Sequence, residues 1–144
     1  MKILVIDDDP AMTELLSLVL APTKAEIITS NSGEEGLRLA GEVNPDIVLL
    51  DLMMPKMDGW QVTENIRKFS STPILILSVL DNPGLVAKAL DKGADDYLVK
   101  PVPSGILIAH INNLTRRRGV RNPDTAPLKI EVVNQKKSVN TKVL

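Results

Sequence analysis

Five short apolar runs alternate with segments of helical periodicity, and this alternation constrains the fold more than any other feature. The runs are too uniformly apolar to have a solvent-facing side, which is typical of parallel strands covered on both faces. They are "KILVI" (2–6), "AEIIT" (25–29), "DIVLL" (46–50), "PILIL" (73–77) and "YLVK" (97–100). Because each parallel crossover needs a helix, the pattern predicts an α/β fold, a doubly wound parallel sheet with helices on both faces.

Helical patterns occupy the segments that follow these runs, at 10–21, 32–43, 59–69, 82–93 and 103–118. Asp9 is a candidate N-cap, since Pro10 suits the first helical position. Asp58, which precedes a glycine, is more typical of a turn or cap than of a ligand. The third helical segment, 59–69, places Val62, Ile66 and Phe69 on one face.

Length and composition exclude several classes of function. The chain has 144 residues, which suits one domain. Its net charge of −1 predicts neither a nucleic-acid nor a membrane partner for the chain as a whole. The absence of cysteine rules out disulfides, thiol nucleophiles and thiolate metal sites. The start is too acidic for a signal peptide and no apolar run approaches the ~20 residues that span a bilayer, so we expect a soluble, cytoplasmic protein.

Polar residues follow the predicted strands at the point where each strand ends. They are Asp7, Asp8, Asp51, Ser78 and Lys100. In open parallel sheets, ligands bind outside the carboxyl ends of the strands, where the strand order reverses. Three carboxylates suit a hard divalent cation such as Mg²⁺, which joins one or two carboxylates to a phosphate. A lysine and a serine hydroxyl suit phosphoryl oxygens, so the edge is predicted to support phosphorylation of an aspartate.

Four motifs in this order resemble the receiver domain of two-component response regulators. They are "VIDDD", "DLMMPKMDG", "ILILS" and "GADDYLVKP", and the resemblance covers residues 1 to about 118. It is closest in pattern to the winged-helix class of transcription regulators. The resemblance implies a flavodoxin-like sheet with strand order 2-1-3-4-5. It also implies a signalling switch that is phosphorylated by a sensor histidine kinase. The switch itself is not an enzyme in the usual sense, since it catalyses only its own phosphorylation and dephosphorylation.

The resemblance implies a role for each polar residue at the sheet edge. Asp51 matches the phosphoacceptor of the family. Asp7, Asp8 and Asp51 match its Mg²⁺ ligands, and Met53 is expected to offer its backbone carbonyl to the same ion.

Three further residues match the family's phosphoryl contacts and its switch. Ser78 and Lys100 are expected to contact the phosphoryl group, and Tyr97 matches the aromatic residue whose rotamer changes on activation. The Lys100–Pro101 peptide bond is expected to be cis, which an X–Pro bond tolerates.

The chain departs from the family at the face formed by the last predicted strand and the last two predicted helices. Relatives of the winged-helix class commonly join this face to a partner subunit through charged pairs. The matching positions here are Ile106 and His110 on the last helix and Val86 on the helix before it. With Asp96, these residues form a candidate homodimer contact in which an apolar pair replaces a charge pair.

Residues 119–144 differ in composition from the rest of the chain. A segment rich in Pro, Asn and Asp is followed by strand-like stretches around two lysines. Two interpretations stay open: the truncated start of an effector domain, or a linker that continues as a flexible basic tail. Neither provides an element that could enter a DNA groove, so DNA binding is not supported for this chain alone.

Two other functions compete with the phosphorylation switch. One is a receiver-like protein-binding module that works without phosphorylation, for which the local argument is Val79, because relatives have a smaller residue beside the serine. The other is a metal-dependent phosphohydrolase, which is disfavoured because no second acid stands two residues after Asp51.

Overall fold

Five parallel strands form one sheet in the order β2-β1-β3-β4-β5 in the computed structural model, which describes residues 1–117. The strands are β1 (Lys2–Ile6), β2 (Glu26–Ser30), β3 (Ile47–Leu50), β4 (Ile74–Ser78) and β5 (Asp96–Val99). Each predicted strand is present, and the predicted order is confirmed. The chain reverses direction across the sheet between β1 and β3, so the switch point lies between these two strands.

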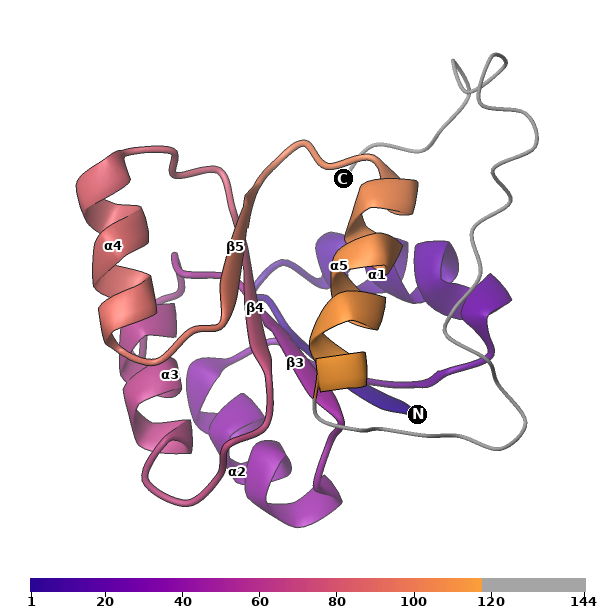
Figure 1. Ribbon diagram of the computed structural model, residues 1–144. Coiled ribbons are helices and arrows are strands. Elements are labelled where there is room, and N and C mark those ends of the chain that lie inside the picture. Colours follow the sequence, from indigo (N-terminus) through magenta and orange to yellow (C-terminus); the bar gives the residue numbers. More distant parts are fainter. Residues whose placement is uncertain (118–144) are drawn as a thin grey trace.

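Helices cover both faces of the sheet (Figure 1). They are α1 (Pro10–Leu20), α2 (Gly33–Val43), α3 (Gly59–Ile66), α4 (Pro83–Asp91) and α5 (Ser104–Arg117), with a short 3-10 turn, η1, at Ala21–Thr23. Helices α1 and α5 pack on one face, whereas α2, α3 and α4 lie on the other. The doubly wound architecture predicted from the apolar runs is therefore confirmed.

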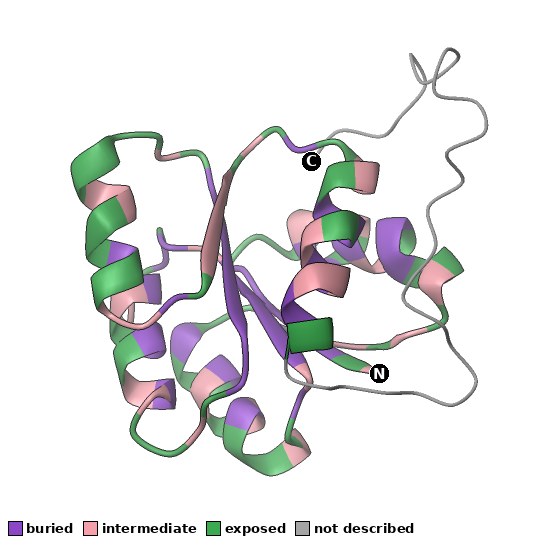
Figure 2. Cartoon of the chain, viewed as in Figure 1, coloured by how far each residue is buried: buried purple, intermediate pink, exposed green. Residues whose placement is uncertain are grey.

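Alternate residues of the central strands face two separate apolar cores. Ile3 and Val5 of β1 point to the core under α1 and α5, whereas Leu4 and Ile6 point to the core under α2, α3 and α4. Strands β3 and β4 are buried along their whole length (Figure 2). Burial on both faces explains why these strands read as continuous apolar runs.

Two helices begin at the predicted positions, each with an N-cap side chain. Asp9 accepts a hydrogen bond from the Ala11 backbone N–H at 3.0 Å, which confirms it as the N-cap of α1. Asp58 accepts from the Gln61 N–H at 2.9 Å, and the Gln61 side chain accepts in return from the Asp58 N–H. This reciprocal capping box confirms that Asp58 is a cap residue.

The prediction that the third helix continues to Phe69, with Val62, Ile66 and Phe69 on one face, is wrong. Helix α3 ends at Ile66, and the Phe69 side chain is 53% exposed. The Arg67 guanidinium donates to the carbonyls of Ser70 and Thr72, at 3.2 and 2.7 Å, and so holds the chain in a turn towards β4. In the turn that follows the helix, the N–H groups of Phe69 and Ser70 both donate to the Ile66 carbonyl, at 3.1 and 2.9 Å.

The predicted linker or tail at 119–144 lies outside the described residues, as does the end of the predicted receiver domain at residue 118. Within residues 1–117, no helix combines the length and the apolar character needed to cross a membrane.

Candidate functional site

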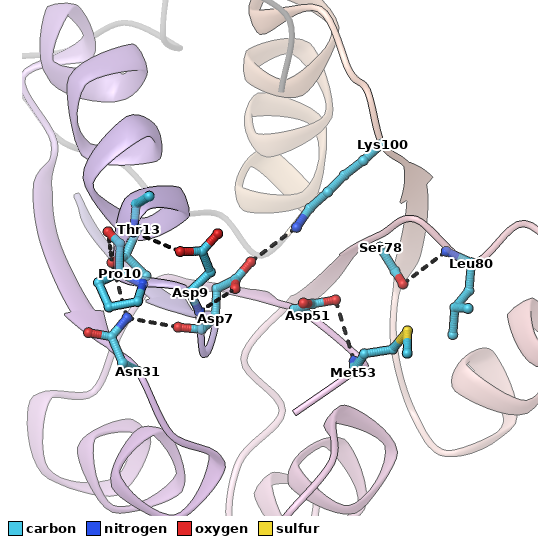
Figure 3. Close-up of polar contacts among 11 residues, drawn as sticks. Asp7, Asp9, Pro10, Thr13, Asn31, Asp51, Met53, Ser78, Leu80 and Lys100 are labelled. Carbon is cyan, nitrogen blue, oxygen red and sulfur yellow. Dashed lines mark hydrogen bonds and ion pairs between the residues drawn. The ribbon is translucent and has the colours of Figure 1, made fainter. Parts of the chain in front are cut away.

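Backbone hydrogen bonds that continue the strand ladders place the predicted residues at one edge of the sheet. The Asp7 N–H donates to the Ser30 carbonyl at 3.1 Å, and the Asp51 N–H donates to the Ile6 carbonyl at 3.0 Å. The Lys100 N–H donates to the carbonyl of Ser78, the last residue of β4, at 2.8 Å. Asp7, Asp51 and Lys100 therefore each stand one residue beyond a strand, around the switch point (Figure 3).

Asp7 is the most firmly held carboxylate of the site, with an exposed fraction of 3%. Its Oδ1 accepts from the Asp9 N–H at 2.9 Å, and its Oδ2 accepts from the Lys100 Nζ at 3.0 Å. The Asn31 side chain donates to the Asp7 carbonyl at 2.8 Å. Lys100 reaches across the edge to make this buried ion pair (Figure 3), and the peptide bond that follows it is cis, as the resemblance implies.

Asp7, Asp8 and Asp51 form an acidic cluster that is suited to a divalent cation. One carboxylate oxygen from each lies within 4.8 Å of the other two. Asp7 is buried, Asp51 is partly buried and Asp8 is exposed, so the cluster opens to solvent on the Asp8 side. When all three are ionised, Lys100 compensates only one of the three charges. Hard oxygen ligands with uncompensated negative charge are what Mg²⁺ binds in proteins, so the residues present fit this ion.

The environment of Asp51 disfavours its ionised form. Burial raises the pKa of Asp51, and the nearby Asp7 raises it further. Lys100 and the backbone N–H groups of Leu52 and Met53 lower the pKa, but the net direction is upward. A cation bound beside Asp51 would reverse this balance by favouring the carboxylate.

The loop after Asp51 is held close to the carboxylate by the start of α3. The Gly59 N–H donates to the Leu52 carbonyl at 2.9 Å. A Cβ atom at position 59 would lie 2.3 Å from the Asp51 carbonyl oxygen, so only glycine allows this approach. The Met53 N–H points to Asp51 Oδ1 at 3.5 Å, and the Met53 side chain is 55% exposed at the rim of the site.

Ser78 and Tyr97 contact the same residue of the β4–α4 loop. The buried Ser78 Oγ accepts from the Leu80 N–H at 3.2 Å, and the Tyr97 hydroxyl donates to the Leu80 carbonyl at 2.6 Å. Burial raises the pKa of Tyr97, a hydrogen bond with Ser78 lowers it, and the negative charges of Asp51 and Asp81 raise it. Leu80 thus links the two residues that the resemblance implies for the switch.

The four predicted interface residues lie on α4, β5 and α5. Ile106 is 48% exposed, and Val86 is partly buried. Asp96 and His110 contact each other within the chain, with 2.5 Å between Asp96 Oδ2 and His110 Nδ1. The other oxygen of Asp96 accepts from the Tyr97 N–H at 2.8 Å. Sequence reasoning named both members of this pair but missed their contact, because no local spacing indicates it.

Comparison with known proteins identifies the family. The protein-family model for the response regulator receiver domain matches residues 3–112. The transcriptional regulatory protein AfsQ1 of Streptomyces coelicolor is 36% identical over 141 residues, which cover 98% of this chain and 63% of AfsQ1. The regulator RpaA of Synechocystis, whose name describes it as a DNA-binding dual master transcriptional regulator, is 37% identical over 93% of this chain and 56% of RpaA.

The fold comparison agrees with the sequence comparison. The receiver domain of the Francisella response regulator 1452 superposes with a TM-score of 0.77 and 34% identity, over 81% of this chain and 98% of that one. The chain therefore belongs to the response regulator receiver domain family, as the motifs predict. It spans less than two thirds of the length of the curated relatives described above.

Proposed function

We propose that this chain is the phosphorylation-activated switch of a two-component system, and that Asp51 accepts a phosphoryl group from a sensor histidine kinase. The observation that carries the proposal is the meeting of three carboxylates within 4.8 Å beside the Lys100–Asp7 ion pair, at the switch point of a receiver fold. In the transfer, an Asp51 oxygen bonds to phosphorus as the bond to the kinase imidazole breaks. The electron pair of that bond returns to the imidazole nitrogen.

Asp7, Asp8 and Asp51 would hold Mg²⁺, together with the backbone carbonyl of Met53. The ion, when bound, supplies positive charge that neutralises the phosphoryl oxygens as charge shifts during transfer. Asp7 suits the role of a fixed ligand, because its backbone and side chain are both hydrogen-bonded. The exposure of Asp8 leaves a side of the cluster by which a donor can approach.

Lys100 and Ser78 would orient the transferred group. The Lys100 ammonium lies 3.0 Å from Asp7, so it is already held at the acidic edge. A phosphoryl group on Asp51 brings about −2 charge and three strong acceptor oxygens, which attract an ammonium and a hydroxyl donor. The buried Ser78 hydroxyl stands at the end of the neighbouring strand, where it can donate to one of these oxygens.

The change at Asp51 would then pass to the face formed by α4, β5 and α5. If Ser78 turns towards the phosphoryl group, its contact with the Leu80 N–H is lost and the β4–α4 loop is released. Tyr97 holds the carbonyl of the same residue at 2.6 Å, so a shift of this loop moves the tyrosine. Two arrangements of the loop, with different affinities for the phosphoryl group, would make the chain a two-state switch.

The output face would act by association. Val86 and the exposed Ile106 provide an apolar contact, whereas Asp96 and His110 contact one another within the chain. We infer a homodimer contact at this face that rests on apolar burial. Because the matched relatives carry names of transcriptional regulators, we infer that the switch serves transcription regulation. The proposal assigns no DNA contact to residues 1–117.

The competing function, a binding module that works without phosphorylation, rested on Val79. Val79 is 64% exposed, so it lies at the surface beside the buried Ser78 and not in the core. The deciding experiment is incubation with acetyl phosphate and Mg²⁺, followed by intact-mass measurement. Wild type should gain one phosphoryl group and Asp51→Asn none. Asp9→Asn is the matched control, because asparagine is an equally good N-cap and the variant should still be phosphorylated. Unmodified wild type would favour the binding module.

A further inference from the structure

Helix α4 has few contacts with the core. The one buried residue of α4 is Ala89, whereas α5 buries five residues against the sheet. A helix with so little buried apolar surface is only weakly positioned by packing. Besides its packing on β5, α4 contacts its neighbour α3.

Lys88 of α4 and Lys92, the C-cap of α4, contact two residues of α3. The Lys88 Nζ lies over the Trp60 ring, 4.5 Å from its centroid. One helical turn further along, the Lys92 Nζ lies 3.2 Å from Glu64 Oε2. The two residues on each helix are four positions apart, so each pair lies on one helix face. We call these four residues the α3–α4 clasp.

Trp60 is the central residue of the clasp. Its Nε1 is buried without a hydrogen-bond partner among the described residues. Its ring packs against the core under α2, α3 and α4. The indole is therefore held by packing and by the Lys88 ammonium. Figure 1 shows the two helices side by side.

The start of α3 lies directly against the backbone of Asp51. The Gly59 N–H donates to the Leu52 carbonyl at 2.9 Å, and there is no room for a Cβ atom between Gly59 and the Asp51 carbonyl oxygen. Trp60 is the next residue. A displacement of the Asp51 backbone therefore moves the first turn of α3, because the two backbone segments are in close-packed contact.

We propose that the α3–α4 clasp positions α4, and that it carries a change at Asp51 to α4 through α3, beside the route through Ser78 and Tyr97. The second half of this proposal rests on the proposed function. Lys88 and Trp60 are positioning residues, because they act on the output face through α4 and touch no reacting atom. Helix α4 would then respond to Asp51 at both of its ends. The β4–α4 loop acts on its start, and α3 acts on its end through the clasp.

The first arm of the test uses the unmodified protein. Amide hydrogen exchange across α4 is measured in wild type, Lys88→Met and Lys88→Arg. Methionine keeps an unbranched side chain of good helix propensity but has no charge, and arginine keeps the cation over the ring. We expect exchange about two- to fivefold faster in Lys88→Met and close to wild type in Lys88→Arg. Lys68→Met is the control, since the Lys68 ammonium contacts Asn65 near the end of α3. Unchanged exchange in Lys88→Met, or equal loss of protection in Lys88→Arg, would overturn the positioning role.

The second arm adds acetyl phosphate and Mg²⁺, and the change in each variant is divided by its phosphoryl occupancy, which intact mass measures, because Ser78 also contacts the site. We expect Lys88→Met and Ser78→Ala each to keep part of the phosphorylation-dependent change in α4 exchange, and the double variant to lose it. If Ser78→Ala alone abolishes the change at full occupancy, the route through α3 does not exist. A wild type that takes up no phosphoryl group would overturn the proposed function and the transmission with it, whereas the first arm decides the positioning of α4 by itself.

Discussion

Replacing Asp51 with asparagine is expected to stabilise the chain when no divalent cation is present. Burial raises the pKa of the Asp51 carboxyl, Lys100 lowers it and Asp7 raises it, with a net upward direction. The ionised form is therefore less favourable in the folded chain than in the unfolded chain. Asparagine has nearly the same shape and no charge, so the substitution removes this cost.

The size of the gain follows from the spacing of the charges. Oxygens of Asp7 and Asp51 lie within 4.8 Å, and two unit charges at that separation repel by about 3.5 kcal/mol at an effective dielectric constant of about 20. The Lys100 ammonium, 3.0 Å from Asp7, offsets much of this repulsion. Solvent screens the rest, because Asp51 is only partly buried. We expect a net gain of about 1 kcal/mol, or roughly 3–6 °C in Tm for a domain of this size.

The gain depends on pH in a defined direction. Between the ordinary pKa of Asp51, 3.8, and its higher value in the folded chain, the folded state binds more protons than the unfolded state. The free energy of unfolding of wild type therefore falls as the pH rises through this window. The difference between Asp51→Asn and wild type should be small below the window and complete above it. Thermal unfolding followed by circular dichroism in the presence of EDTA, below the window and at neutral pH, measures this difference.

A control and a metal arm complete the experiment. Glu14→Gln removes an exposed carboxylate from α1 and should leave Tm unchanged. Mg²⁺ at ten times its Kd should stabilise wild type by about 1.4 kcal/mol through mass action and should shift Asp51→Asn much less. The account of the site is refuted if Asp51→Asn is less stable than wild type at neutral pH without metal, or if Mg²⁺ shifts both proteins equally.

Three further predictions concern the switch, the output face and the lifetime of the phosphorylated state. Ser78→Ala should still be phosphorylated but should lose the phosphorylation-dependent change in the NMR signals of the Tyr97 ring; an unaltered change would show that the coupling is wrong. Self-association should persist at high salt and weaken in Ile106→Glu, because burying an apolar side chain contributes about 1.5–3 kcal/mol and salt scarcely screens this contribution. Sedimentation equilibrium measures the association, and dissociation by salt alone would contradict the prediction. Leu80→Glu should speed the loss of the phosphoryl group, because a carboxylate can help to position water, whereas a change at the exposed Val79 should alter this rate less. Equal decay rates in wild type and Leu80→Glu would exclude this role of Leu80.

Apolar patterning was sufficient to predict the sheet because the central strands are buried on both faces. The prediction was least accurate at the edges. The signal for β5 is weaker, since its residues are half-buried or exposed, and the strand begins at Asp96, one residue earlier than predicted. Phe69 continues the helical periodicity, but the helix ends at Ile66, and the Phe69 N–H makes a turn contact with the Ile66 carbonyl at 3.1 Å. Periodicity carries no information about such a contact.

The residues of the site could be predicted, but their contacts could not. Parallel strands bring their carboxyl ends to one edge, so the positions of Asp7, Asp51 and Lys100 follow from the fold. The Lys100–Asp7 pair joins residues 93 positions apart, and its geometry depends on the whole sheet. The contact of Asn31 with the Asp7 carbonyl is of the same kind, at a separation of 24 positions. No local pattern encodes contacts over such distances.

The most direct test of the central claim is to locate the phosphoryl group in the chain. After incubation with acetyl phosphate and Mg²⁺, borohydride reduces an aspartyl phosphate to homoserine, and peptide mass spectrometry identifies the altered residue. The account predicts homoserine at position 51 alone, and none in a sample prepared with EDTA in place of Mg²⁺. Homoserine at position 8 or 58, or equal conversion at position 51 without the metal, would contradict it.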